Sequence, residues 1–156
     1  MFKKFSKGST GTTGSTGAEA EAAAVDTQAR GAHAEQRALD HLTRRGLRLV
    51  ARNYRVARGP SARGGEVDLI LRERDGTLVF VEVRARGHDA HGGAAASVTR
   101  HKQRRVIFAA QCFLRTQRVV PPCRFDVVAI DGDRIEWLRG AFDAASPWSR
   151  DGWTPD

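Results

Sequence analysis

The sequence predicts a single α/β domain in which helices flank a mixed β-sheet, a reasonable size for 156 residues. A helical pattern over residues 28–45 is followed by strand patterns over 47–55, 66–72 and 77–85. The first three strands can form an antiparallel meander. A second helical pattern then precedes a strand at 124–130, and this long crossover lets the strand lie parallel to 77–85 with a right-handed connection.

Both ends of the chain differ in composition from this domain. Residues 1–27 consist largely of Gly, Ser, Thr, Ala and Glu, which offer too little apolar surface to offset the entropy of ordering. We therefore expect a disordered tail over 1–27 and a domain over 28–143. Residues 144–156 are weakly patterned, and we expect a weakly structured C-terminal tail there.

The first predicted helix has one apolar face and a clear end. Ala34, Ala38 and Leu42 share that face, and Gly46 is a natural C-terminal stop. Glu35 lies beside the apolar stripe.

The second predicted helix can be capped by Ser97 or Thr99 and runs to about Thr116. Its basic first turns contain Arg100, His101, Lys102, Arg104 and Arg105. Such a run is most often a solvated helix face, but a helix N-terminus also favours phosphate. After the strand at 124–130, an Asp-Gly turn leads into the short strand "RIEWL".

The hairpin formed by strands 66–72 and 77–85 carries acids within apolar runs, and parity fixes its register. The apolar residues expected on the core face are Val67, Leu69, Leu71, Val79, Val81 and Val83. Opposite residues must then have an even sum, which requires a loop with an odd number of residues, such as Arg74-Asp75-Gly76. This register places Asp68 opposite Glu82 and Glu66 opposite Arg84.

Two interpretations of these acids fit the spacing equally well. Like charges directly opposite each other on a sheet destabilise it, and a divalent cation with oxygen ligands would compensate for them. In the alternative, the acids lie on a polar face, with a Glu66–Arg84 cross-strand ion pair and Glu82 beside Arg86 or a helix arginine. Leu78 and Phe80 have the same parity as Glu82, so this face is also covered, which favours the cation.

The charge balance points to a polyanionic partner. The formal net charge is +8, and nearly all of the basic residues are arginine, whose planar fork binds two phosphate oxygens at once. A basic surface that serves only solubility is the alternative. No apolar run approaches the ~20 residues that a membrane helix needs, and no secretory signal is visible. Cys112 and Cys123 lack metal-site spacing, so we expect buried, reduced thiols and a cytoplasmic location.

The segments "GGEVDLI", "LVFVEVRAR" and "RFDVVAI", together with the "GAHAEQRALDHL" helix, resemble the YraN-like family of small bacterial proteins over about residues 31–143. The fold of that family is similar to the restriction-endonuclease-like PD-(D/E)XK nucleases, in particular archaeal Holliday-junction resolvases. The resemblance implies a Mg²⁺ or Mn²⁺ site in which Asp68 and Glu82 are ligands and Glu35 completes the set.

The same resemblance assigns further roles. The motif lysine falls on Arg84, which keeps the charge but cannot act as a base, and Lys102 can supply an ammonium instead. Glu66 belongs to the family's "GE-x-D" block, and Gln103 is where related nucleases often carry a polar helix residue. Asp126 is either a supporting residue of the site or an ordinary ion-pair partner.

The predicted function is therefore nucleic-acid binding, with a metal-dependent, structure-selective DNA endonuclease as the sharper hypothesis. DNA is favoured over RNA, Arg100, Arg104 and Arg105 are the expected phosphate contacts, and a homodimer stays open. The replacement of the motif lysine by Arg84 supports one alternative, a non-catalytic nucleic-acid-binding module with the nuclease fold. A basic factor that binds an acidic protein is the other alternative.

Overall fold

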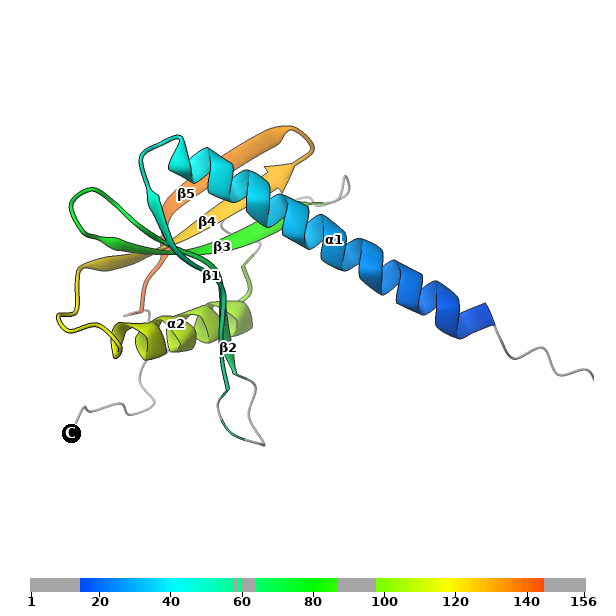
Figure 1. The fold of residues 1–156 in the computed structure, drawn as a ribbon, viewed down its shortest axis with the longest axis horizontal. Helices are drawn as coiled ribbons and strands as arrows, with labels where there is room; N and C mark the ends of the chain where they lie inside the picture. Colours follow the sequence, from blue (N-terminus) through cyan, green and yellow to red (C-terminus); the bar gives the residue numbers. More distant parts are fainter. Residues whose placement is uncertain (1–14, 58, 60–63, 87–97, 145–156) are drawn as a thin grey trace, which may run out of the picture.

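The computed structural model describes residues 15–57, 59, 64–86 and 98–144 as two helices and one five-stranded sheet. The elements are α1 (Ser15–Thr43), β1 (Arg48–Val56), β2 (Gly65–Arg72), β3 (Leu78–Arg86), α2 (Arg100–Leu114), β4 (Cys123–Asp131) and β5 (Arg134–Phe142). The strand order is β1-β2-β3-β4-β5, antiparallel except for the parallel pair β3–β4, which α2 connects (Figure 1). The predicted fold class, meander and crossover are confirmed.

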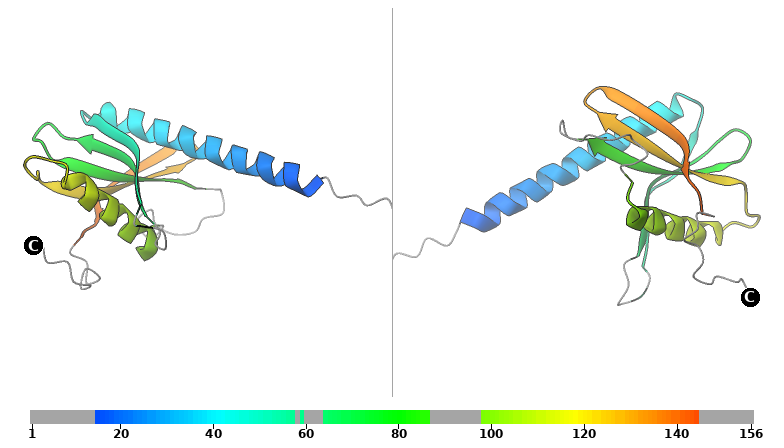
Figure 2. Two further views of the ribbon diagram at one scale, coloured as in Figure 1. Left: turned by 60° about the horizontal axis from the view of Figure 1, so that its bottom comes forward. Right: turned by 180° about the vertical axis from the view of Figure 1, so that it is seen from behind.

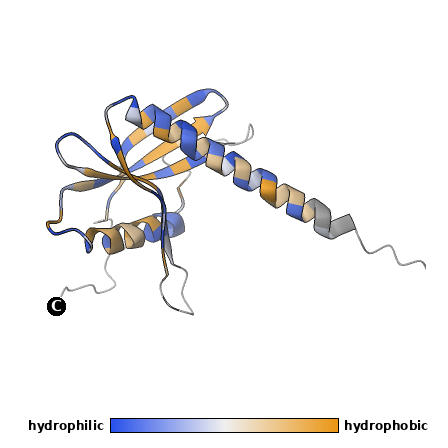
Figure 3. Ribbon diagram, in the orientation of Figure 1, coloured by the Kyte–Doolittle hydropathy of each residue, from blue (hydrophilic) through white to orange (hydrophobic). Residues whose placement is uncertain are grey.

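The two helices cover opposite faces of the sheet, as Figure 2 shows. On the α1 face, the helix buries Ala34, Ala38 and Leu42 against a cluster that includes Val79 and Val81. On the α2 face, the buried residues include Ile70, Leu78 and Phe80 of the sheet and Val106, Ala109 and Ala110 of the helix. The sheet is therefore covered on both sides, and its central strands β3 and β4 are largely apolar (Figure 3).

The β2–β3 hairpin has the register that parity predicts over its paired residues, but Val67, expected on the same face as Leu69, belongs to the cluster on the α2 face. Leu69 pairs with Val81, and Arg72 pairs with Leu78. The next pair closes a three-residue loop, 74–76, because the N–H of Glu73 donates to the carbonyl of Thr77 at 2.9 Å. Within this loop, Gly76 has φ of 95°, a left-handed conformation that glycine adopts without steric penalty.

Helix α1 begins at Ser15, well before the predicted start at residue 28. Residues 20–30, which were predicted to be disordered up to residue 27, form exposed helix that projects beyond the sheet (Figures 1 and 2). The Ala- and Glu-rich composition explains the difference, since both residues are strong helix formers even where no tertiary contact assists them. Residues 1–14 and 145–156 lie outside the described part, so the predicted tails there are not addressed.

Within the described ranges, no helix has the length and apolar character that crossing a membrane requires. Neither cysteine forms a disulfide. Their predicted burial is wrong in detail, because Cys112 is half-buried and Cys123 is exposed.

Candidate active site

Asp68 of β2 and Glu82 of β3 are both buried, with exposed fractions of 8% and 1%. The ladder of paired residues ends at Leu69 and Val81, and Asp68 and Glu82 are the next residues on the two strands. Beyond this point a side-chain oxygen takes the place of a backbone carbonyl as acceptor: the backbone N–H of Val83 donates to Oδ2 of Asp68 at 2.8 Å.

Burial raises the pKa of both carboxyl groups. For Glu82, burial and the neighbouring Asp68 carboxylate raise the pKa to about 7, against the opposing positive charges of Lys102 and Arg84. For Asp68, burial also raises the pKa, although the N–H of Val83 and the charge of Lys102 oppose the shift. The Asp68 carboxylate makes ionisation of Glu82 less favourable, and the Glu66 carboxylate likewise raises the pKa of Asp68, which is how closely placed acids behave.

The two oxygens of Glu82 have different surroundings. The Lys102 ammonium lies 3.2 Å from Oε1, and Arg84 approaches the same oxygen at 3.9 Å. Oε2 is buried and has no hydrogen-bond partner. An unsatisfied buried carboxylate oxygen is costly, so Oε2 needs a proton or a cation that the described residues do not supply.

Glu66 does not pair with Arg84, so the cross-strand ion pair of the polar-face alternative is not formed. Arg55 of β1 lies 2.9 Å from Oε1 of Glu66, and Arg105 of α2 lies 3.2 Å from Oε2. Arg105 also donates to the carbonyl of Gly64 at 3.3 Å. Arg105, predicted to be a phosphate contact, is therefore used to attach α2 to the start of β2.

The start of α2 is built by local capping. Thr99 is the N-cap, and its side chain accepts from the backbone N–H of Lys102. The amide of Gln103 donates to the carbonyl of Val98 at 3.0 Å, so this residue supports the helix entry and no contact joins it to the acids. Arg100 and Arg104 are exposed, as a phosphate-binding role requires.

Glycine lets α2 approach β2 closely. A Cβ on Gly65 would lie 2.6 Å from the carbonyl oxygen of Arg105 and 2.7 Å from the nitrogen of Ala109. The backbone of α2 thus packs directly against β2, and this packing determines how far Lys102 lies from the sheet.

Glu35 is not brought to the acid pair as a third ligand. Its Oε2 accepts a hydrogen bond of 3.0 Å from Nδ2 of Asn53 in β1. In the described part of the chain, no group of three acidic, histidine or cysteine side chains converges closely enough to hold a metal ion. The predicted set of Asp68, Glu82 and Glu35 is therefore not assembled by direct contact.

Asp126 lies on the other face of the sheet, so it is not a supporting residue of this site. It pairs in register with Val81, whose side chain belongs to the α1 face. Its carboxylate is fully buried and accepts from Arg124, from the indole N–H of Trp137 and from the N–H of Gly140. The ion-pair alternative is the one that the contacts support.

The comparisons with known proteins agree on one family. The family model described as "Uncharacterised protein family UPF0102" matches residues 34–130. A UPF0102 protein of Acidovorax sp. (strain JS42) is 62% identical over 124 residues, which cover 80% of this chain and 92% of that protein. The chain belongs to the UPF0102 family. Another UPF0102 protein, from Methylibium petroleiphilum, is 61% identical over 121 residues, which cover 78% of this chain and 99% of that protein.

Membership of the UPF0102 family confirms the predicted YraN-like assignment, whereas the relation to nucleases stays a prediction. A UPF0102 protein of Cupriavidus taiwanensis is also 62% identical over 117 residues, which cover 75% of this chain and 85% of that protein. The names of these relatives state no activity, so the chemistry of the site has to be inferred from its own residues.

The residues of this UPF0102 site fit Mg²⁺. Asp68 and Glu82 offer hard oxygen donors, and Mg²⁺ is commonly bound by one or two carboxylates while it keeps several waters. The orphaned Oε2 of Glu82 is the group that such an ion would satisfy. A closed zinc site does not fit, because it needs four nitrogen, sulfur or oxygen ligands from the protein.

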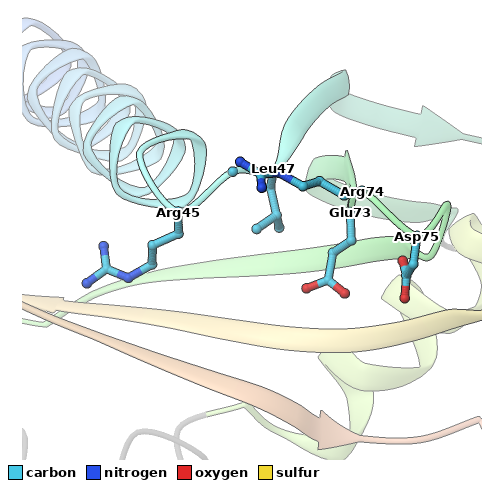
Figure 4. A pocket seen from close by; sticks show the side chains of 6 residues that line it. Arg45, Leu47, Glu73, Arg74 and Asp75 are labelled. Atoms are coloured by element: carbon cyan, nitrogen blue, oxygen red, sulfur yellow. The ribbon is translucent and has the colours of Figure 1, made fainter.

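A separate hollow of about 360 Å³ lies at the loop end of the hairpin and is lined by Arg45, Gly46, Leu47, Glu73, Arg74 and Asp75 (Figure 4). Both acidic and basic side chains line it. None of its residues belongs to the acid pair, and it is not part of the candidate site.

Two residues of the site region were missed by sequence reasoning. Arg55, the partner of Glu66, was indistinguishable from the other arginines of β1. Asn53 carried one usable signal, since asparagine is depleted in strands and often marks a left-handed conformation.

Proposed function

We propose that this protein is a Mg²⁺-dependent endonuclease that hydrolyses phosphodiester bonds in DNA. The observation that carries this proposal is the unpartnered, buried Oε2 of Glu82 beside Asp68, with the Lys102 ammonium on the other oxygen. Two carboxylates that can hold an ion, with a cationic side chain beside them, suit metal-assisted phosphodiester hydrolysis. The basic net charge of +8 supports a polyanionic substrate.

The residues divide this work among them. Asp68 and Glu82 would hold the ion, which when bound acidifies a water and offsets charge on the scissile phosphate. Lys102 stabilises the negative charge that develops on the phosphate, since its ammonium already points at the acid pair. Arg84, 40% exposed, contacts a substrate phosphate from the rim of the site and remains charged throughout.

Binding of the DNA backbone uses the start of α2. Arg100 and Arg104 are exposed on the first turns of this helix, where the N-terminal dipole also favours phosphate. Preference for branched DNA follows from the resemblance to resolvases, and DNA is favoured over RNA on the same ground. A dimer is part of that resemblance and is proposed with it.

One observation favours a second candidate, a non-catalytic nucleic-acid-binding module. The position of the motif lysine is occupied by Arg84, which cannot act as a base. In this account Lys102 serves only to neutralise Glu82, and the basic surface binds nucleic acid without cleaving it.

A panel of DNA and RNA structures distinguishes these candidates. Duplex, single-stranded and four-way-branched substrates are incubated with the protein in Mg²⁺, Mn²⁺ or EDTA, and binding and cleavage are scored separately. The endonuclease cleaves only with the divalent ion, and Asp68→Asn abolishes cleavage while it preserves binding. Binding in EDTA with no cleavage under any condition would favour the module.

A further inference from the structure

Arginines gather at the loop end of the β2–β3 hairpin, away from the acid pair. Arg45 of the α1–β1 turn and Arg74 of the β2–β3 loop line the same hollow of about 360 Å³ (Figure 4). A Cβ on Gly46 would lie 3.5 Å from Nε of Arg74, so the turn and the loop are in contact. Arg48, at the start of β1, pairs in register with Arg72 of β2. These residues and their neighbour in the turn form a cluster that we call the arginine end: Arg44, Arg45, Arg48, Arg72 and Arg74.

Acids do not neutralise this cluster within the described part of the chain. No ion pair among the described residues involves a member of the arginine end. Two acids line the same hollow, but both are engaged by other groups. Glu73 accepts two bonds of 2.8 Å from Arg124, and Asp75 accepts from the backbone N–H two residues further on. Arg72 donates to the backbone carbonyl of Gly76, a bond that leaves its charge in place.

Two further observations indicate an uncompensated positive potential at the arginine end. Arg48 and Arg72 lie directly opposite each other, and like charges in that arrangement destabilise a sheet. Burial lowers the pKa of His41, and the charges of Arg45 and Arg44 lower it further. The fold therefore keeps like charges together here, and an anionic ligand would relieve their repulsion.

Ordinary protection of a sheet edge does not account for this charge. Strand β1 is an edge strand, and charged side chains commonly keep such strands from pairing with other chains. That purpose needs charge but not a single sign, whereas residues 44–57 contain five arginines and no acid. A second copy of this chain fits poorly, because two such surfaces would repel each other. An arginine fork binds two phosphate oxygens at once, so a row of phosphates suits this surface.

We propose that the arginine end contacts the phosphate backbone of a nucleic acid, as a second surface in addition to the start of α2. This inference rests on the nucleic-acid binding of the proposed function, and it does not depend on cleavage. Asp68 precedes Arg72 by four residues on β2, which at about 3.3 Å per residue separates the acid pair from the arginine end by about 13 Å along the strand. Because duplex DNA rises by about 3.4 Å per base pair, a substrate that reaches both extends over about four base pairs or more.

The test is the salt dependence of DNA binding by the full chain. A labelled duplex of about 20 base pairs, several times the required span, is titrated in EDTA, which prevents cleavage. The arginine-end variant, Arg44→Ala with Arg48→Ala, should reduce the log–log salt slope by about 1.8, since each phosphate contact contributes about 0.9. Its Tm should not fall, because Arg44 is exposed and loss of Arg48 removes the repulsion of Arg72.

A matched control removes the same charge from other places. Arg30→Ala with Arg134→Ala lowers the net charge equally, but both arginines already lie beside an acid. Arg30 forms an ion pair with Asp26, and Arg134 pairs in register with Asp131. The salt slope of this control should stay within about 0.5 of the parent, which is less than one phosphate contact.

The outcomes separate this inference from the proposed function. Adding Arg104→Ala to the arginine-end variant should lower the slope by about a further 0.9, because distant contacts with the same DNA are additive. Equal slope changes in the two double variants would show that only net charge matters and would overturn the inference, while nucleic-acid binding would stand. A parent that binds no DNA would overturn both.

Two further measurements complete the test. In sedimentation velocity, self-association of the parent that is lost in the arginine-end variant, with an unchanged DNA slope, would assign the arginine end to a second copy and overturn the inference. Cleavage is scored separately in Mn²⁺. A parent that binds DNA through the arginine end and never cleaves it would confirm the second surface and reject the endonuclease.

Discussion

The Lys102 ammonium lies 3.2 Å from Oε1 of Glu82, while Oε2 of the same carboxylate is buried and unpartnered. The lysine comes from α2 and the glutamate from β3, so the contact depends on how closely the helix packs on the sheet. The ammonium neutralises one oxygen of the Glu82 carboxylate and leaves the other oxygen without a partner among the described residues.

The Asp68→Asn substitution should distinguish between a cation site and a structural ion pair at this position. At pH 8, above the pKa of about 7 of Glu82, the substitution relieves like-charge repulsion of up to about 1 kcal/mol and should raise the metal-free Tm by about 2–4 °C. The parent should gain about 2.7 kcal/mol at an Mn²⁺ concentration 100 times its Kd, and the variant should lose this response. Thermal melts in EDTA and in Mn²⁺ measure both, with Asp133→Asn in an exposed turn as control. A variant that is destabilised and indifferent to Mn²⁺ would rule out the cation site.

The stability of the metal-free protein should fall as pH rises. The pKa of Glu82 is raised to about 7 in the folded protein from 4.5, so the folded state binds more protons in this window. The stabilisation from Glu82 is complete below pH 4.5 and is lost as pH approaches 7, with a slope of up to about 1.4 kcal/mol per pH unit. Urea unfolding in EDTA from pH 4.5 to 8 measures it, and Glu82→Gln should remove this component. The lowered pKa of His41 contributes with the opposite sign and is common to both proteins. Identical pH profiles for parent and variant would contradict the prediction.

Arg104 and Arg105 should behave differently although they are neighbours in sequence. Arg104 is exposed, so Arg104→Ala should leave Tm unchanged and reduce the salt slope of duplex DNA binding by about 0.9. Arg105 holds Glu66 and the carbonyl of Gly64, so Arg105→Ala should destabilise the protein by about 1 kcal/mol. Fluorescence titration between 50 and 200 mM salt, about the range over which phosphate contacts are resolved, measures the slope. Equal stability losses in both variants would show that Arg105 has no special structural role.

The close approach of α2 to β2 makes Gly65 sensitive to substitution. Gly65→Ala places a methyl group 2.6 Å from the carbonyl oxygen of Arg105, so the helix must shift, at a cost of about 1–3 kcal/mol. Gly31 in α1 is the control, since a Cβ there meets no atom within 4 Å and alanine should stabilise the helix by about 0.5–1 kcal/mol. Denaturant unfolding gives both values. A neutral Gly65→Ala variant would mean that α2 has room to move, and that its height does not set the position of Lys102.

The register of the hairpin between Leu69 and Val81 could be predicted because side-chain alternation leaves no freedom there. A slip of one residue in the hairpin would exchange Val81 for Glu82 on the α1 face, and the Asp-Gly loop accommodates only one of the two alternatives. The position of Asp126 could not be predicted in the same way. Its face depends on the register of β4 against β3, which a crossover through a helix does not fix locally.

Side-chain partners on other elements could not be predicted from the sequence, for a different reason. Glu66 had several arginines within reach, and the choice of Arg55 and Arg105 depends on the bend of β1 and on the packing of α2 at Gly65. Glu35 was correctly placed beside the apolar stripe of α1. Its partner Asn53 adopts a conformation that strand propensity does not predict.

Lys102, and not Arg84, should supply the cationic group that hydrolysis requires. Lys102 is 3.2 Å from Glu82 and its side chain is 22% exposed, whereas Arg84 is 3.9 Å away and 40% exposed. Loss of one stabilising donor typically reduces kcat by about 10²–10³-fold, so Lys102→Ala should have an effect of that size on cleavage of branched DNA. Arg84→Lys should retain cleavage, because a lysine at that position keeps the charge and adds a group able to exchange a proton.

The rates are measured at saturating Mn²⁺, since removal of Lys102 also changes the charge around Glu82 and thereby the affinity for the ion. Lys102→Arg is the conservative control: it keeps the charge, so it should restore cation binding more fully than it restores cleavage, because the planar guanidinium does not place its charge where the compact ammonium does. Cleavage that survives Lys102→Ala but is lost in Arg84→Ala would show that Arg84 of β3, and not Lys102 of α2, stabilises the charge on the phosphate. If neither parent nor variants cleave while all bind DNA, the contact between Lys102 and Glu82 serves only to neutralise a buried acid, as the non-catalytic module requires.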